Sequence, residues 1–219
     1  MNRIITSLAV AAFAGAAHAQ YSQELGAGSL DEGAGIEIGG INTAPFFMNA
    51  QGNDGDGFSE FYVMRFDLSA YSGAAVDSVT IDLRHAEASF AASGGVRISY
   101  STDDLTALNT LDFDIASVGG NNGQLAATEV AAFDYIDLPG DDVTTIDTIT
   151  LNDVGGLFAD ISSQGVITLI FEATEAGTAA LYSGIGNFEG AQVLNVYEVP
   201  APGAVALFGL GGLAVRRRR

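Results

Sequence analysis

The stretch that decides the fold is EFYVMRFDL, residues 60–68, in which apolar side chains stand at most positions. Tyr62 and Phe66 share one face of an extended chain, because successive side chains of a β-strand point to opposite sides. The opposite face still carries Phe61 and Val63. A strand that is apolar on both faces is buried on both, so this segment is predicted to lie in the centre of a sheet.

The same period of two recurs along the chain. In residues 78–84 the apolar Val79, Ile81 and Leu83 alternate with polar residues, which predicts a strand with one solvent face. Shorter runs of this kind occur at 96–100, 111–115, 133–138, 143–151, 166–172, 179–183 and 191–197. Turn signals rich in Gly, Asn and Asp separate them, and between the two chain ends the one helical signal is a single turn at 157–161. The expected fold is all-β: an antiparallel two-sheet β-sandwich, jelly-roll-like.

Composition limits the class of protein further. The chain has 219 residues, 28 glycines and 48% hydrophobic residues, which is typical of one globular β-rich domain. It has no lysine, and between its terminal segments three arginines, Arg65, Arg84 and Arg97, face 27 acidic residues, a balance of −24. Such a field repels phosphate backbones, so no nucleic acid is expected as a partner. It suits solubility, attraction of divalent cations or salty surroundings.

Residues 1–19 contain the three parts of a secretory signal peptide in their usual order. Arg3 provides a basic start, and an apolar stretch follows that predicts a signal helix. Ala17 and Ala19 form the small-x-small ending at which signal peptidase cuts, so that Gln20 becomes the new N-terminus. The chain is therefore expected to be exported, with residues 20–198 as the folded domain.

Residues 199–219 carry a second signal. The uncharged residues 203–215 reach about 20 Å as a helix, short of a hydrocarbon core of roughly 30 Å. Four arginines follow, and by the positive-inside rule they hold the C-terminus on the cytoplasmic side. They are Arg216, Arg217, Arg218 and Arg219. This short apolar helix is expected to be a transient inner-membrane anchor that leaves the acidic domain outside.

This tail resembles a known sorting signal. Val199-Pro200-Ala201-Pro202, the short Gly/Ala/Leu-rich segment and the terminal arginines are similar to the PEP-CTERM signal of bacteria with exopolysaccharide-rich envelopes. Ala201 stands where the name-giving motif has Glu. The resemblance implies recognition by exosortase, a membrane protease-transpeptidase, with cleavage near the Pro motif and release or transfer to the cell surface.

The body of the chain resembles a second family. VMRFDLS at 63–69 and AVDSVTIDL at 75–83 are similar to the core of DNRLRE-type domains, and residues 186–190 with 193–197 are similar to their last strand. The resemblance spans roughly residues 41–198. It implies a jelly-roll like that of carbohydrate-binding modules, and contact with exopolysaccharide. Because the chain has no Trp, sugar stacking would require an exposed row of tyrosines.

One loop has the oxygen-rich composition of a calcium site. The candidate ligands are Asn53, Asp54, Asp56 and Glu60. Calcium takes several oxygen ligands from a chain able to fold around it, and the glycines between these residues supply that freedom. The spacing excludes an EF-hand, because position one would be Gly52 and position twelve Val63. An irregular calcium site and a solvated turn remain alternatives, and no other cofactor is expected.

The remaining titratable residues are interpreted as structural. The acidic pairs, which fall at expected turns or strand ends, are Asp103-Asp104, Asp112 with Asp114, and Asp141-Asp142. His85, at the end of a strand, is expected to be an edge residue, because transition-metal sites generally need several His or Cys. No G-x-S-x-G elbow occurs. The protein is therefore not expected to be an enzyme.

Together these patterns predict an exported bacterial cell-surface or extracellular-matrix protein with a non-catalytic structural or adhesive role. Two alternatives stay open. One is an exopolysaccharide-binding module. The other is a glycan hydrolase, which requires a cleft with two carboxyl groups about 5 to 10 Å apart.

Overall fold

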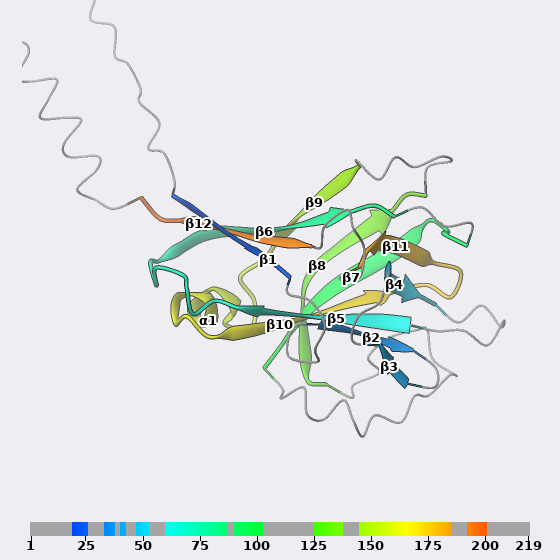
Figure 1. Ribbon diagram of the computed structural model, residues 1–219, viewed down its shortest axis with the longest axis horizontal. Helices are drawn as coiled ribbons and strands as arrows, with labels where there is room; N and C mark the ends of the chain where they lie inside the picture. Colours follow the sequence, from blue (N-terminus) through cyan, green and yellow to red (C-terminus); the bar gives the residue numbers. More distant parts are fainter. Residues whose placement is uncertain are drawn as a thin grey trace, which may run out of the picture.

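The computed structural model describes residues 19–25, 33–37, 40–42, 47–52, 60–86, 90–102, 125–137, 145–184 and 192–200. In this part of the chain nearly all regular structure is β-strand, and the strand pairs are antiparallel. The strands form two sheets that face each other across a shared hydrophobic core (Figure 1). The prediction of an all-β, antiparallel two-sheet sandwich is confirmed. The expected signal helix and C-terminal apolar helix lie outside the described residues.

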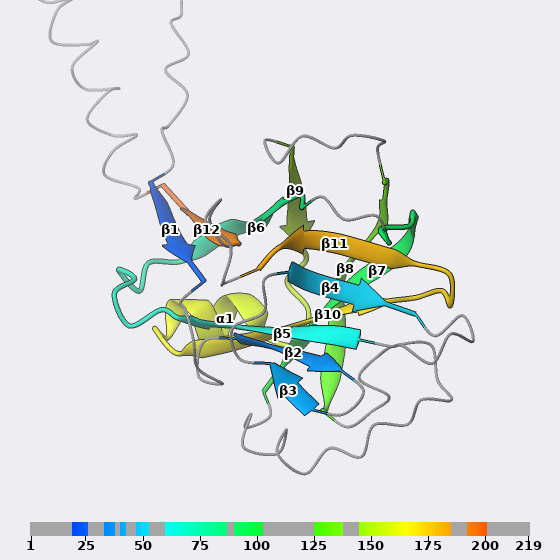
Figure 2. The ribbon, with the colours of Figure 1, turned by 45° about the vertical axis from the view of Figure 1, so that its right-hand side comes forward.

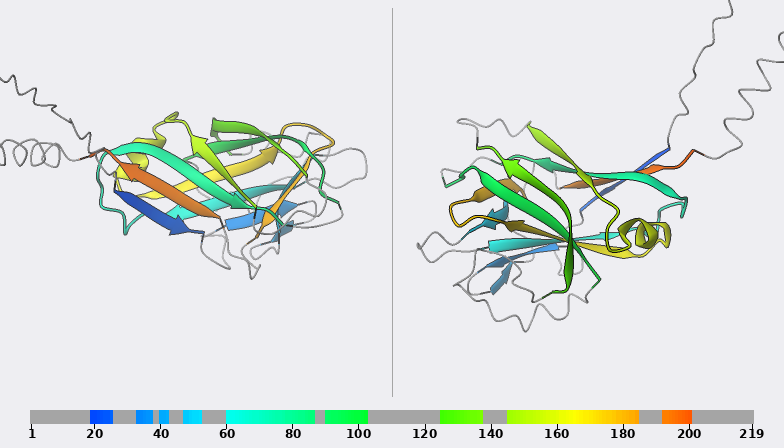
Figure 3. Two further views of the ribbon diagram at one scale, coloured as in Figure 1. Left: turned by 90° about the horizontal axis from the view of Figure 1, so that it is seen from above. Right: turned by 180° about the vertical axis from the view of Figure 1, so that it is seen from behind.

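The smaller sheet, sheet A, has four strands in the order β1, β12, β6, β9. Their bounds are Gln20–Glu24 for β1, Val193–Glu198 for β12, Val76–Arg84 for β6 and Ile146–Leu151 for β9. The first and last strands of the described residues, β1 and β12, therefore lie side by side (Figure 3). β12 is an interior strand, because it pairs with β1 on one side and with β6 on the other.

The larger sheet, sheet B, runs in the order β11, β4, β5, β10, β7, β8, with β2 paired to β5 and β3 paired to β2 (Figure 2). The bounds are Gly33–Glu37 for β2, Gly40–Asn42 for β3, Phe47–Gln51 for β4, Glu60–Asp67 for β5, Gly94–Ser101 for β7, Ala127–Tyr135 for β8, Val166–Ala173 for β10 and Ala179–Ser183 for β11. The one helix of the described residues, α1 (Leu157–Ser162), packs at an end of the sandwich against β6 and β10.

Strand β5 lies in the centre of sheet B, as its sequence predicts. Its neighbours are β10 on one side and β2 on the other. Tyr62 and Phe66 point into the core between the sheets, whereas Phe61 and Val63 are buried on the other face of sheet B. A strand buried on both faces has no solvent side, which explains why its apolar residues do not alternate with polar ones.

Strand β6 has the two-sided character that its alternation predicts. Val79, Ile81 and Leu83 are fully buried in the core. The outer face carries a row of hydrogen bonds across the sheet, in which Asp82 accepts from Thr148 Oγ1 over 2.6 Å and from Asn195 Nδ2 over 2.9 Å. Sheet A therefore buries one face and presents a polar one to solvent.

The other predicted segments agree with the strands to different degrees. The runs at 96–100, 143–151, 166–172, 179–183 and 191–197 correspond to β7, β9, β10, β11 and β12, and the turn at 157–161 corresponds to α1. The run at 133–138 was misplaced, because β8 begins at Ala127 and ends at Tyr135. β1, β2, β3 and β4 were not predicted. The run at 111–115 lies outside the described residues.

Candidate functional site

The two processing points expected from the sequence lie together at one end of sheet A. β1 begins at Gln20, the residue after the expected signal cleavage, and pairs with Tyr197 near the end of β12. The backbone N–H of Glu198 donates to the carbonyl oxygen of Ala19 over 2.9 Å. The N–H of Val199, the first residue of the expected tail, donates to Ala75 O over 2.8 Å. The terminal strands of the described residues, β1 and β12, therefore start and end next to the two expected processing points.

Side chains hold this end of the sheet in place. Ser72 Oγ donates to Glu198 Oε1 over 2.6 Å, and the rings of Tyr21 and Tyr71 pack with centroids 5.4 Å apart. The Tyr71 hydroxyl donates to Ala74 O over 3.0 Å. Burial, with the nearby Glu198 carboxylate, raises the pKa of Tyr71, so this hydroxyl stays protonated as a donor. The loop between β5 and β6 thus supports both ends of the domain.

The other residues of the two expected signals lie beyond the described part of the chain. Of the expected sorting motif, Val199 and Pro200 are described, whereas Ala201, Pro202 and the four terminal arginines are not. The signal residue Ala17 is likewise outside it, and Ala19 is inside. Within the described residues, no helix has the length and apolar character that crossing a membrane requires.

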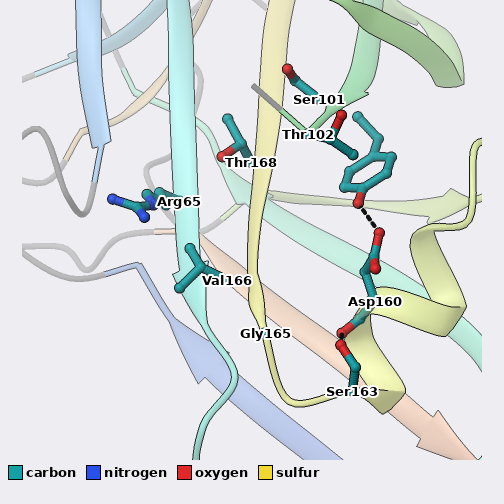
Figure 4. A pocket seen from close by; sticks show the side chains of 9 residues that line it. Arg65, Ser101, Thr102, Asp160, Ser163, Gly165, Val166 and Thr168 are labelled. Atoms are coloured by element: carbon teal, nitrogen blue, oxygen red, sulfur yellow. Dashed lines mark hydrogen bonds between the residues drawn. The ribbon is translucent and has the colours of Figure 1, made fainter. Parts of the chain in front are cut away.

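A second site is a pocket of about 390 Å³ beside α1, at the ends of β7 and β10 (Figure 4). Its lining residues are Arg65, Tyr100, Ser101, Thr102, Asp160, Ser163, Gly165, Val166 and Thr168. Arg65 lies on one flank of this pocket, and Asp160 and Ser163 lie on the other (Figure 4). The side chains come from β5, β7, β10, α1 and the residues that follow α1. No single sequence motif therefore indicates the pocket.

The α1 side of the pocket is fixed by hydrogen bonds. The Tyr100 hydroxyl donates to Asp160 Oδ2, and Ser163 Oγ donates to the Asp160 carbonyl oxygen over 2.8 Å. Burial, with the hydrogen bond to Asp160, raises the pKa of Tyr100, so its hydroxyl remains a donor at physiological pH. The carboxylate is therefore held in one orientation toward the pocket end of the sandwich.

His85 is not the edge residue that its sequence position suggests. It is 2% exposed, and its Nε2 lies 2.9 Å from Asp147 Oδ2, which also accepts from the Tyr182 hydroxyl over 2.6 Å. Its ring stacks on Tyr135, with centroids 5.3 Å apart. These partners come from both sheets, so the cluster ties them together. Its hydrogen bonds and burial give His85 a structural role.

The expected calcium ligands are described only in part. Asn53, Asp54 and Asp56 lie outside the described residues. Glu60 is 7% exposed and accepts from Asn49 Nδ2 over 3.0 Å, so it faces the β4–β5 pair. Among the described residues, no three His, Cys, Asp or Glu side chains are grouped as a metal ion requires. The acidic pairs at 103–104, 112 with 114, and 141–142 are also outside them.

The described residues bear on one feature of each alternative. An exposed tyrosine row is lacking, because Tyr62, Tyr71, Tyr100, Tyr135 and Tyr182 are buried and Tyr21 and Tyr197 are partly buried. The pocket beside α1 is lined by one carboxylate, Asp160, whereas glycoside hydrolysis uses two.

Comparison with models of known protein families gives no match, and comparison with curated protein sequences gives no significant relative.

Proposed function

We propose that this chain is an exported bacterial protein that is delivered to the cell surface or extracellular matrix, where its β-sandwich has a structural or adhesive role without catalysis. The observation that carries the proposal is the pairing of β1 with β12. Two independent sequence signals, one for export and one for sorting, adjoin the first and last strands of one sheet. Proteases acting on either side would release the domain whole.

The proposed division is a signal peptide at 1–19, a domain at 20–198 and a sorting tail at 199–219. It is supported by the bounds of the terminal strands, because β1 starts at Gln20 and β12 ends at Glu198. Both sheets contribute to one core, which supports a single domain. We extend the sandwich to a jelly-roll on the resemblance of its strands to DNRLRE-type domains.

The proposed partner is an exosortase-like sorting enzyme, which recognises the tail while the arginines hold it in the inner membrane. Before cleavage the C-terminus lies in the cytoplasm and the domain lies outside. Calcium at the loop before β5 remains a proposal that rests on its oxygen-rich sequence. Titration with calcium tests it directly, and an unchanged melting temperature at millimolar calcium contradicts it.

Binding of exopolysaccharide is a second candidate function, and the hydroxyl-rich pocket beside α1 favours it. It is compatible with surface delivery, because a matrix protein meets such polymers after export. The lack of a second lining carboxylate favours binding over cleavage.

Intact mass of the protein extracted from the cell surface tests the delivery proposal. The expected mass lacks residues 1–19 and the residues after the Pro motif. Replacing Arg216, Arg217, Arg218 and Arg219 with Gln should leave the tail uncut and reduce surface delivery, because the cationic stop is removed. The matched control is Arg84→Gln on β6, which should be processed normally. Native protein in the cytosol with both ends uncut would overturn the proposal.

A further inference from the structure

We propose that the pocket beside α1 binds one unit of a neutral sugar, or the end of a neutral glycan chain. The volume, about 390 Å³, lies near the lower end of the range of small-ligand pockets, roughly 300–1,000 Å³. Thr102, Ser163 and Val166 at its margin are exposed, so a ligand can enter from solvent. A site of this size suits a chain end better than a long segment lying through it.

The chemistry of the lining favours a polyhydroxyl compound. Four alcohol side chains line the pocket: Ser101, Thr102, Ser163 and Thr168. Each alcohol can donate one hydrogen bond and accept others, as each hydroxyl of a sugar does. Arg65 adds donors and Asp160 adds acceptors, and their formal charges cancel. The lining is therefore neutral and mixes donors with acceptors.

Three of these side chains form a row across sheet B. Arg65 on β5 is paired with Thr168 on β10, and Thr168 is paired with Ser101 on β7. Directly paired residues of neighbouring strands share a face, so the row extends over two strand spacings, about 10 Å. Thr168 is 5% exposed and Ser101 is 3% exposed. Side chains already fixed by the sheet lose little further freedom when they bind a ligand.

The pocket also has a small apolar part. Val166 and the ring of Tyr100 lie among the polar groups. A sugar ring presents C–H groups on its faces as well as hydroxyls at its rim, so an aliphatic and an aromatic surface beside the hydroxyls match both parts. This arrangement uses no exposed aromatic row.

Charge favours a neutral sugar over an acidic one. The acidic body repels anions over a distance comparable to the Debye length, about 8 Å at physiological ionic strength. A sugar carboxylate in the pocket would also lie near Asp160. A neutral sugar is repelled neither by the acidic body nor by Asp160. It can form hydrogen bonds with both Arg65 and Asp160.

The other polar surface, the outer face of sheet A, is less suited to a ligand because its groups bind one another. Asn195 Oδ1 accepts from Ser22 Oγ over 2.7 Å and from Gln20 Nε2 over 3.1 Å. Asn195 Nδ2 donates in turn to Asp82 over 2.9 Å, and Asp82 also accepts from Thr148. A ligand there would have to break these bonds before forming its own.

The inference deepens the second candidate function and is independent of export and sorting. Its test is saturation-transfer NMR on the full-length chain in a detergent without a sugar headgroup. The probes are the methyl glycosides of glucose, galactose and mannose, with methyl glucuronide as the acidic counterpart. At least one neutral glycoside should receive saturation at about 10 mM, the range expected for weak sites. The intact-mass measurement tests export and sorting, so its outcome does not depend on whether the pocket binds a sugar.

Two variants locate the binding. Thr168→Val keeps the shape of the side chain and removes its hydroxyl, and it should weaken binding about fivefold, the loss of one hydrogen bond. Asp160→Asn, on the exposed side of the pocket, provides a second test and should also weaken binding. Thr150→Val on β9 is the matched control and should leave binding unchanged.

Circular dichroism of each variant establishes that it is folded. The inference is overturned if no neutral glycoside binds, if the glucuronide binds better, or if Thr168→Val and Asp160→Asn, when folded, bind as well as the Thr150→Val control.

Discussion

The carbonyl oxygen of Ala19 accepts a hydrogen bond from the backbone N–H of Glu198 over 2.9 Å, so the residue before β1 is bonded to the last residue of β12. This acceptor belongs to the peptide bond that signal peptidase is expected to cut. In the fully paired sheet the carbonyl group of this peptide bond is hydrogen-bonded to β12, so the peptide bond is not free to enter a protease. Cleavage should therefore precede the pairing of β1 with β12, which is the last strand of the described residues and is synthesised long after β1.

Hydrogen exchange at Glu198 reports this cleavage. Removing residues 1–19 removes the acceptor, so the Glu198 amide should exchange at least about tenfold faster in the cut protein than in the uncut one. The Val199 amide, which donates to Ala75 O over 2.8 Å, should exchange at the same rate in both. The uncut form comes from Ala17→Phe, which removes a small side chain that signal peptidase requires. Equal exchange at Glu198 in the two forms would contradict the observed pairing at this end.

The cluster around Asp147 makes stability depend on acid pH. The hydrogen bond from His85, followed by that from the Tyr182 hydroxyl, lowers the pKa of Asp147 below its ordinary value of 3.8, against the opposing effect of burial. A carboxyl whose pKa is lowered by folding stabilises the protein above the unfolded pKa, and this contribution is lost as the pH falls through the folded pKa.

Asp147→Asn should therefore reduce the free energy of unfolding at neutral pH, and the difference from the wild type should shrink as the pH falls below about 4. Urea titrations at several pH values measure it. The control is Asp134→Asn, an exposed position on β8. A difference that stays constant with pH would rule out the ionised Asp147 as its source.

The ion pair of Arg97 and Glu172 predicts a non-additive pair of substitutions. Glu172, whose side chain is 2% exposed, accepts from Arg97 Nε over 3.1 Å and from Nη2 over 3.3 Å. Arg97→Met should cost about 3 kcal/mol, because it removes the guanidinium that balances a buried carboxylate. The double variant Arg97→Met with Glu172→Met should recover much of this loss, because it removes the buried charge. Chemical denaturation measures both, with Arg84→Met as control, and strictly additive losses would contradict the expectation.

Gly52 occupies a position that should not accept a side chain. A Cβ atom there would lie 2.1 Å from the carbonyl oxygen of Glu175 and 2.7 Å from the Cα of Ala176, so the backbone itself would have to move. Gly52→Ala should therefore lower the free energy of unfolding by about 2 kcal/mol. At Gly177 a Cβ meets nothing within 4 Å, so Gly177→Ala is the control and should be well tolerated. Equal effects of the two substitutions would show that this close approach is absent in solution.

The sequence was informative wherever burial alone sets the pattern. β5 and β6 could be predicted because one or both of their faces consist of apolar side chains. β1 could not, because QYSQE has one apolar residue, Tyr21, and becomes a strand through its pairing with β12. β8 was misplaced because it begins with exposed residues and is rich in alanine, a weak strand former.

The sites could be predicted less well than the strands. The sequence around His85 did not indicate that this residue is buried. Its partner Asp147, and Tyr182, which bonds to the same carboxylate, are far away in the sequence and approach it only in the folded sandwich. The pocket likewise is lined by Arg65 and Asp160 from different elements, and no local spacing encodes their common site. The proposed signals at the chain ends differ from these sites, because signals of that kind act as linear segments, so their pattern lies in the sequence itself.

The interior position of β12 determines how the domain would resist mechanical force. A pull on the polypeptide beyond Val199, balanced by an attachment at the far end of the sandwich, loads β12 along its length. The bonds to β1 and β6 then share the load in shear, so many must break at once. A pull between Gln20 and Val199 instead peels β1 away one pair at a time, so the same molecule is strong when tethered by its tail and weak when drawn apart by its two ends.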